Sequence, residues 1–521
     1  MFSDRFSPAR MMTRPFLSAS FLMRSLVSAR SFGGTGLVAP RPRADLSKTG
    51  VNALPAELVS SSQKSANDRA LLRRRVWTLA LPAVGEQLLA LFVGLSDTFL
   101  TGHLSPSAVQ QLGYGRADAV SAVGVGVTTV WVVLTLFFAV GVGATALVAR
   151  AVGAKDQALS SKGTGQALLL GLLAGALLAA LALPMVHAIT DLMGVQGDVA
   201  DLSAAFLCIF SLGLPAVGVT YAANASMRGS GDTRRPLIVM ALVNGTNIAA
   251  SWLLMNGIAA LGIPALGVIG SACGAAAGWT MGAALALFFL SRQHPISPKL
   301  TRQALKPDRC IMWRVLRIGL PSAAELFVLQ FGVVTFSRLV VDLGSTTYAA
   351  NLTINTIESI GNLPGLGFAV AATTLVGQAL GAKDPDLARR SAWAALRPCF
   401  LFMLGMGICA LVLPQMLLSL FVADNGVVQA GIPALRFSLL TLPALAISFI
   451  CNGSLRGAGD TKFPVVVRAA GTWGVRVPIA LLLIPWLGLI GARLAMAADF
   501  WVQASLSCWR FRSGRWRKAH V

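Results

Sequence analysis

The chain has 521 residues, of which 55% are hydrophobic and only 12% are charged. A soluble domain carries about 25% charged residues, so this composition excludes a soluble globular protein and predicts an integral membrane protein. The net charge of +22 would also suit a nucleic-acid-binding protein, but the basic residues are spread over loops without an aromatic-studded face, so membrane topology and anionic lipid explain them better.

The first 75 residues differ in composition from the rest of the chain. Up to Arg43 this arm contains seven Arg, seven Ser and a single acidic residue, Asp4. Such a composition is typical of an organellar transit peptide, and an unstructured arm is the alternative. The basic run at 73–75 predicts a cytoplasmic anchor for the span that follows.

Apolar stretches long enough to cross a membrane recur along the remainder. About 20 residues of α-helix cover the ~30 Å hydrocarbon core. The stretches lie at 77–103, 121–149, 165–189, 202–226, 237–257 and 266–290, and then at 315–341, 349–379, 393–421, 430–453, 465–486 and 489–509. The sequence therefore predicts an all-α polytopic membrane protein with twelve transmembrane helices.

A nonapeptide that occurs twice indicates an internal duplication. Arg228-Gly-Ser-Gly-Asp-Thr-Arg-Arg-Pro236 returns 228 positions later as Arg456-Gly-Ala-Gly-Asp-Thr-Lys-Phe-Pro464, and the pair at 152–156 and 380–384 has the same spacing. We therefore expect two homologous six-helix bundles, an N-lobe at 76–291 and a C-lobe at 315–510. A basic linker at 292–314 joins them, and a basic tail follows at 511–521.

Basic residues are concentrated on alternate loops. The nonapeptides, the loops at 150–162 and 383–390, the linker and the C-terminal tail carry them, whereas the opposite loops hold Arg116 and little else. The positive-inside rule predicts that both termini and both nonapeptides face the cytoplasm. The expected location is the plasma membrane, the inner membrane of a bacterium, with an organellar membrane as the alternative if residues 1–75 are a transit peptide.

We interpret the nonapeptides as cytoplasmic elbows between the fourth and fifth span of each half. Their glycines, at 229, 231, 457 and 459, allow positive φ, and their aspartates can cap the following helix. They lack the GKS/T ending of a phosphate-binding loop. The residues that define the elbows are Arg228, Gly231, Asp232, Arg456, Gly459 and Asp460.

Two acids on the first span are candidate functional residues, because an ionisable group at bilayer depth costs roughly 3 kcal/mol. Glu86 and Asp97 are eleven residues apart, which places them on one helix face. Glu86 has a repeat partner, Glu325, whereas Asp97 falls opposite Phe336. This asymmetry favours Asp97 as an ion-coupling site, with a hydrogen-bonded structural acid as the alternative. Glu86 and Glu325 each follow a proline by four residues and are predicted to pin helices together.

The eighth span carries a polar stripe on one helix face. Its members are Asn351, Asn355, Glu358 and Asn362. An acid among amides suits a protonatable or cation-binding position, so Glu358 is the second ion-coupling candidate, and interhelical hydrogen bonding is the alternative.

The fifth span repeats this pattern with Asn244, Asn247 and Ser251, which we expect in the substrate cleft. On the eleventh span, Arg476 is expected to pair with an acid such as Glu358 or Glu325. Three further charges, Arg338, Asp342 and Asp499, are interpreted as interface or structural charges.

The motifs together resemble the multidrug and toxic compound extrusion (MATE) family. The similarity covers about 76–510 and is carried by the runs at 79–87, 97–104 and 373–382 and by the two elbows. It implies two six-helix bundles around a V-shaped cleft, and export of organic, often cationic, compounds in exchange for H⁺ or Na⁺. The family's first-span aspartate falls on Asp97, and its polar fifth-span positions fall near Asn244 and Asn247. A seventh-span coupling glutamate of some members is replaced here by Leu329 and Gln330, which makes Glu358 the best substitute.

Other functions have less support in the sequence. A lipid-linked oligosaccharide flippase of the same superfamily would need a basic central cleft, for which Arg476 and Arg338 are available. A channel would use the same polar stripes. The four histidines are scattered and the seven cysteines lack CxxC spacing, so we expect no enzyme, metal site or cofactor. The expected partners are the lipid bilayer and small organic substrates, with no nucleic acid, and the expected state is a monomer.

Overall fold

The computed structural model describes residues 56–257, 262, 264–292 and 298–518, with side chains from residue 68 onward. Residues 63–521 form one compact unit. Most of the arm predicted at 1–75 therefore lies outside the described residues. The described part of the chain contains helices and turns and no strand.

Long helices account for nearly all of the described chain, as the composition predicts. The first half contains α1 (Ala56–Gly102), α2 (Pro106–Leu112), α3 (Arg116–Gly153), α4 (Gln157–Leu192), α5 (Asp198–Ser230), α6 (Arg234–Asn256) and α7 (Gly267–Ser291). The second half contains α8 (Arg309–Val341), α9 (Ser345–Gly381), α10 (Pro385–Val412), α11 (Pro414–Ser419), α12 (Asn425–Arg436), α13 (Ser438–Gly457), α14 (Lys462–Gly471), α15 (Val477–Leu487) and α16 (Leu489–Arg512). A π-helical turn, Thr472–Arg476, joins α14 to α15.

Eleven of the described helical segments are long and apolar enough to cross a membrane. They correspond to the first eleven predicted spans, with α14, the π-helical turn and α15 counted as one. The predicted twelfth span is α16, a helix of 24 residues that carries Arg493 and Asp499 in its interior and falls outside the set. The all-α polytopic fold is confirmed, and Arg493 and Asp499 of α16 are buried within the protein.

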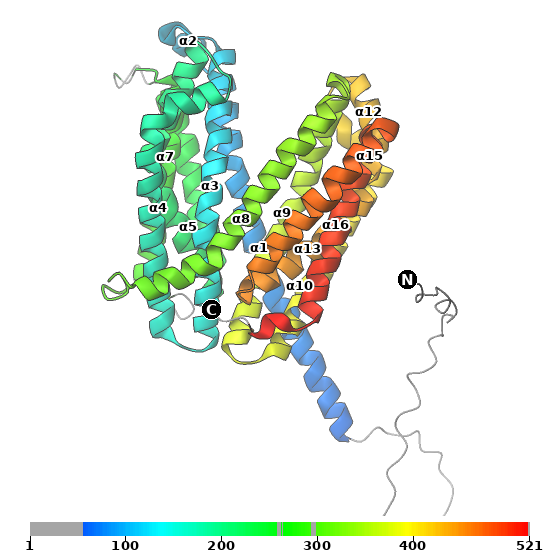
Figure 1. Cartoon of the computed structure of the whole chain (residues 1–521). Coiled ribbons are helices and arrows are strands. Elements are labelled where there is room, and N and C mark those ends of the chain that lie inside the picture. Colours follow the sequence, from blue (N-terminus) through cyan, green and yellow to red (C-terminus); the bar gives the residue numbers. More distant parts are fainter. Residues whose placement is uncertain (1–55, 258–261, 263, 293–297, 519–521) are drawn as a thin grey trace, which may run out of the picture. The chain divides into compact units, whose positions relative to one another are not determined.

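The helices pack into two bundles, each with its own core. One core is built mainly from α3, α4, α5 and α7, and the other mainly from α9, α10, α13 and α16. Figure 1 shows α4, α5 and α7 in one bundle and α10, α13 and α16 in the other. This is the predicted pair of bundles. They meet at one end and diverge toward the other, which gives a V.

The first helix of each half crosses between the bundles. Val76 of α1 lies in the core of the second bundle, whereas further along α1 the Asn244 side chain of the first bundle bonds to the carbonyl of Leu89. In α8 the order is reversed, because Val315 lies in the core of the first bundle and Phe336 in that of the second. Figure 1 shows α8 crossing from one bundle to the other. Each bundle is therefore completed by a helix that starts in the other one.

Close backbone contacts join the bundles at the end where they meet. A Cβ on Gly153 of α3 would lie 1.9 Å from the carbonyl oxygen of Gln378 on α9. A Cβ on Gly319 of α8 would lie 1.9 Å from the carbonyl oxygen of Ala139 on α3. Glycine is needed at these positions because any larger residue would separate the helices. The contacts hold α3 against α8 and α9.

The duplication seen in the sequence extends to individual hydrogen bonds. Thr145 donates to the carbonyl of Ala225 at 3.0 Å, and Thr373, 228 positions later, donates to the carbonyl of Gly453 at 2.8 Å. The turns at Lys155 and Lys383 share a positive φ of 59° and 61°. The two halves therefore share their packing at these positions.

The linker between the halves is fastened to α4. Gln166 donates to the carbonyls of Ala304 and Lys306 and accepts from the backbone N–H of Asp308. Lys162 forms an ion pair of 2.6 Å with Asp308. This hydrogen bond, together with those from two backbone N–H groups, holds the pKa of Asp308 below its ordinary value.

Candidate functional site

A cavity of about 260 Å³ is lined by residues of both bundles. Its walls are largely aromatic and apolar, with Trp131, Tyr221 and Trp279 on the side of the first bundle. Tyr221 stacks on Trp279 with ring centroids 5.8 Å apart. The charged groups at its wall are Glu86, Arg228 and Arg456. Such a mixture of aromatic surface and a few charges is typical of a small-molecule site.

The arginine of each elbow pairs with the glutamate of the first helix in its half. Arg228 binds the carboxylate of Glu86, joining α5 to α1. Arg456 binds Glu325 at 2.7 Å, joining α13 to α8. Arg468 lies 3.7 Å from the same Glu325 carboxylate. The glutamates thus connect helices, the contact expected of helix-pinning acids, and both elbow arginines reach the cavity.

The elbow glycines divide into two kinds. Gly231 and Gly459 have positive φ, at 95° and 83°, and end their helices. The expectation of positive φ at Gly229 and Gly457 is wrong, because both lie inside helices. A Cβ at either position would collide with the backbone of the neighbouring helix. These two glycines therefore serve close helix packing.

The elbow aspartates also differ between the halves. Asp232 accepts a hydrogen bond from the backbone N–H of Arg235 at 3.2 Å, at the start of α6. Asp460 instead binds Arg510 of α16 at 2.8 Å, and no side-chain cap is made at the described N-terminus of α14. The capping role expected of Asp460 is thus replaced by an ion pair.

Asp97 lies in a small side pocket of about 40 Å³ in the first bundle. Five residues line both this pocket and the larger cavity, so the two adjoin: Ala90, Trp131, Leu134, Tyr221 and Trp279. Asn247 donates to Asp97 at 3.0 Å, and the hydroxyls of Ser251 and Ser271 lie beside the same carboxylate. The Asp97 side chain is buried and forms no ion pair with any residue that the structure describes.

Only part of the predicted polar face of α6 surrounds Asp97. Asn247 and Ser251 lie beside the carboxylate, as given above. Asn244 instead donates to the carbonyls of Leu89 and Met240, each at 2.9 Å. Asn244 therefore holds α6 against α1, about one helical turn from Asn247 along α6.

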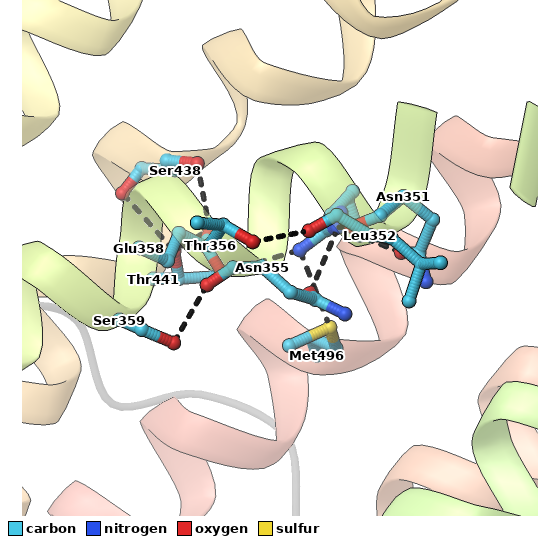
Figure 2. A network of polar contacts seen from close by, with 10 residues as sticks. Asn351, Leu352, Asn355, Thr356, Glu358, Ser359, Ser438, Thr441 and Met496 are labelled. Atoms are coloured by element: carbon cyan, nitrogen blue, oxygen red, sulfur yellow. Dashed lines mark hydrogen bonds and ion pairs between the residues drawn. The ribbon is translucent and has the colours of Figure 1, made fainter. Parts of the chain in front are cut away.

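The polar stripe of α9 converges on an arginine of α16. Arg493 donates to Asn351 at 2.7 Å, to Asn355 at 3.1 Å and to Glu358 at 3.2 Å. Ser438 donates to the other oxygen of Glu358 at 2.6 Å. Figure 2 shows the two asparagines and Glu358 along α9, with Ser438 above them and Met496 below. This network joins α9, α13 and α16 in the second bundle.

The fourth member of the stripe stays outside this network. The Asn362 side-chain oxygen has no hydrogen-bond partner among the described residues. Glu358, by contrast, is neutralised by the Arg493 guanidinium, which is completely buried.

The prediction that Arg476 pairs with an acid such as Glu358 or Glu325 is wrong. Arg476 binds Asp499 at 2.6 Å, and both side chains are buried. Glu325 and Glu358 already have their own arginines, as described above. Asp499 therefore lies in the interior of the second bundle, whereas Arg338 and Asp342 form an exposed pair at 3.9 Å.

A family model described as MatE matches residues 82–253 and 321–482, which is more than half of the chain. The chain belongs to the MatE family. A probable multidrug resistance protein NorM from Thermotoga maritima is 29% identical over 456 residues, covering 86% of this chain and 94% of that protein. A probable multidrug resistance protein YoeA from Bacillus subtilis is 25% identical over 409 residues, covering 78% of this chain and 88% of that protein.

Solved structures of MATE proteins share the fold. An outward-facing multidrug resistance MATE family transporter of the MOP superfamily matches with a TM-score of 0.76 at 20% identity, covering 86% of this chain and 97% of that one. A MOP superfamily transporter from Pyrococcus furiosus matches with a TM-score of 0.75 at 20% identity and the same coverage. The resemblance inferred from the motifs is therefore confirmed, and the chain is a MATE family transporter.

In this MATE family chain the two predicted acids have opposite environments. Asp97 is surrounded by an amide and hydroxyls, whereas Glu358 is bound to an arginine. At the repeat position of Asp97 the second bundle has Phe336, and Arg476 packs over its ring at 5.7 Å. The second bundle thus places a neutralised Arg476–Asp499 pair beside the position where the first has a free carboxylate.

Two features of this MATE family chain could not be found from the sequence: the arginine that binds Glu358 and the aromatic wall of the cavity. Arg493 lies 135 positions from Glu358, and no periodicity of α9 indicates which helix supplies its cation. The aromatic wall also went unnoticed, because Trp131, Tyr221 and Trp279 come from three helices. The pairing of the elbow arginines could have been inferred from the sequence, because Arg228 and Glu86 of the first half both recur in the second half, as Arg456 and Glu325.

Proposed function

We propose that this chain is a secondary active exporter of organic, often cationic, compounds, driven by exchange for H⁺ or Na⁺. The observation that carries the proposal is Asp97, a buried carboxylate without a cationic side chain beside it among the described residues, in a pocket that adjoins the central cavity. An acid in this situation favours binding of a cation. The multidrug resistance names of the relatives support the export of drug-like compounds.

In the proposed exchange, the organic cation and the coupling ion compete for the carboxylate of Asp97. In the cytoplasm-facing state an organic cation occupies the cavity and is attracted by ionised Asp97. In the outward-facing state a proton or sodium ion neutralises Asp97, which removes that attraction and releases the compound. Because the coupling ion then leaves to the cytoplasm, each cycle moves the two in opposite directions. The close contacts of α3 with α8 and α9 would have to separate for the cavity to open on their side.

We also propose that the end of the bundles bearing the elbows faces the cytoplasm. The basic linker, the elbows and the C-terminal tail carry the positive charges that favour this orientation. The relatives named above are bacterial, which supports the inner membrane as the location. A monomer suffices, because one chain supplies both bundles and the whole described cavity.

The coupling role predicted for Glu358 stays a prediction, and we give Asp97 precedence. Arg493 neutralises Glu358 in the state described, so a proton or sodium ion would first have to displace a buried guanidinium. Asp97 needs no such displacement.

Transport by purified protein in liposomes tests the proposal. With an imposed pH or sodium gradient, wild-type protein should concentrate a fluorescent organic cation, and Asp97→Asn should abolish the gradient-driven part. Asp342→Asn is a matched control, because it makes the same change at an exposed acid. Undiminished gradient-driven transport by Asp97→Asn would contradict the coupling role. Imposing the two gradients separately identifies the ion.

A further inference from the structure

We propose that the outer surface of the second bundle, where the end of α16 lies against the start of α10, is a binding site for the headgroup of an anionic phospholipid. Three arginines hold the phosphates of the lipid: Arg389 and Arg397 of α10 and Arg512 of α16. In the part of the chain that the structure describes, none of the three lines the central cavity. The site is therefore separate from the proposed export.

Arg389, Trp393 and Arg397 follow one another along one face of α10. Successive members are four residues apart, which corresponds to about 6 Å along the helix axis. Both arginine side chains are exposed, whereas Ala388 and Ala395 of the same helix are buried in the bundle. The two guanidinium groups are thus presented to the surroundings of the protein.

The end of α16 brings a third arginine to the same face. The guanidinium of Arg512 lies over the Trp393 ring, 5.5 Å from its centroid, and the Arg512 side chain is exposed. Trp393 also contacts Phe511 edge-on, with 6.4 Å between the ring centroids, and Phe511 stacks on the buried Trp516 at 4.9 Å. Because these rings fasten the end of the chain to α10, Arg512 is held beside the residue midway between the two α10 arginines.

None of the three guanidinium groups forms an ion pair with an acid that the structure describes. The two acids at the start of α10 are engaged elsewhere. Asp386 binds Arg517 at 3.6 Å, and Asp384 accepts a hydrogen bond from the backbone N–H of Leu387 at the helix N-terminus. Three exposed like charges along about 12 Å of helix repel one another, so the binding of an external anion is favoured.

The corresponding face of α4 in the first half is compensated from within the chain. Lys162, which returns 228 positions later as Arg390, pairs with Asp308 of the linker at 2.6 Å. Gly165 stands at the repeat position of Trp393, and a Cβ there would lie 2.1 Å from a carbonyl oxygen of the linker. On α10 the covering segment is the end of the chain, which adds a positive charge in place of an acid. The second half therefore leaves the compensating anion to come from outside.

The position of the site selects a phospholipid. The helix α10 is long and apolar enough to cross a membrane, and Arg397 is its last charge before an uncharged stretch at 398–423. Near the end of α16, Trp509 is 53% exposed and Arg515 lies over its ring at 5.6 Å. Exposed tryptophans with basic neighbours are typical of the membrane–water interface. The three arginines therefore lie at the depth of lipid headgroups.

The spacing of the arginines suits a headgroup with two phosphates. A guanidinium binds phosphate through two parallel hydrogen bonds. A row of three such groups about 12 Å long can contact two phosphates at once, as in cardiolipin, a lipid that basic pockets at the ends of transmembrane helices bind.

Binding of purified full-length protein to lipids in detergent, followed by native mass spectrometry, tests the proposal. The probes are cardiolipin and phosphatidylcholine, whose headgroup has no net charge. The wild type should bind cardiolipin at least tenfold more tightly, because one charge-assisted contact changes an affinity about tenfold. Cardiolipin should also raise the melting temperature. Equal affinity for the two lipids, or an equal rise in melting temperature with millimolar inorganic phosphate, would overturn the lipid site.

Variants assign the binding to the three arginines. Arg389→Gln combined with Arg397→Gln removes two exposed charges whose side chains form no hydrogen bond or ion pair with the described residues, and cardiolipin affinity should fall at least tenfold. The control, Arg302→Gln combined with Lys306→Gln, removes two exposed charges of the linker and should bind cardiolipin like the wild type. Arg512→Gln, which leaves α10 unchanged, should also weaken binding. An equal loss in the two double variants, or an unchanged affinity in Arg512→Gln, would overturn the site.

Discussion

The ion pair between Glu358 and Arg493 offers a quantitative test of its structural role. Arg493→Met removes a fully buried guanidinium and leaves the Glu358 carboxylate buried without a cation. Breaking a buried pair in this way costs about 3–5 kcal/mol. Because the Ser438 hydroxyl still donates to Glu358 at 2.6 Å, we expect the lower end, about 3 kcal/mol.

Replacing both partners should be less harmful than replacing one. Glu358→Gln combined with Arg493→Met removes both charges of the pair, and the hydrogen bonds from Arg493 to its asparagine neighbours and its 3.7 Å contact with the Met496 sulfur are lost. Side-chain hydrogen bonds within membranes contribute about 0.6 kcal/mol each on average. At roughly this value for each lost bond, the free energy of unfolding of the double variant should fall by about 1 to 2 kcal/mol. The measurement is a double-mutant cycle on unfolding in mixed detergent and denaturing micelles. A double variant whose loss equals the sum of the two single losses would refute the reasoning.

The double variant also decides between pairing and ion coupling. If Glu358 serves only to pair with Arg493, the folded double variant should keep gradient-driven transport in liposomes. Loss of coupling with intact ligand binding would show that Glu358 takes part in the exchange.

Two further predictions concern the contacts that hold the helices and the linker. Gly153→Ala places a Cβ against the carbonyl of Gln378, so spin labels on α4 and α10 should report a wider separation of the bundles than in the wild type. Gly405→Ala is the control, because its Cβ meets no described atom within 4 Å, and unchanged distances in Gly153→Ala would contradict the contact. For Asp308, whose pKa is lowered chiefly by the hydrogen bond from Lys162, the stabilisation is present above the unfolded pKa and is lost as the pH falls through the folded one. The melting temperature of the wild type should therefore exceed that of Asp308→Asn at neutral pH, and this difference should disappear at acidic pH. A difference in melting temperature that does not depend on pH would show that the carboxylate charge is not its source.

The architecture could be predicted because it depends on local and repeated features. Each span is a run of apolar residues of a length fixed by the bilayer, and the nonapeptides at 228–236 and 456–464 fixed the alignment of the halves. The same alignment identified Asp97 as an acid without a partner in the other half. These inferences require no knowledge of which helices are neighbours.

The charge pairs could not be predicted because they depend on helix neighbours and rotation. Arg476 illustrates this. It ends a π-helical turn, Thr472–Arg476, which adds one residue to the helical path and turns the following face by about 100° from the α-helical period. The prediction named Glu358 or Glu325 because these acids lie within other spans, whereas the acid that Arg476 binds is Asp499 of α16.

The pairing of buried charges differs between the two bundles. In the second bundle each of the three acids that the structure describes as buried, Glu325, Glu358 and Asp499, has at least one arginine. The buried carboxylates of this bundle are therefore each compensated by a guanidinium. The first bundle matches Glu86 with Arg228 and leaves Asp97 with neutral partners. In the exchange that we propose, this arrangement would let the single carboxylate of Asp97 bind the coupling ion while the charge pairs of the second bundle stay intact.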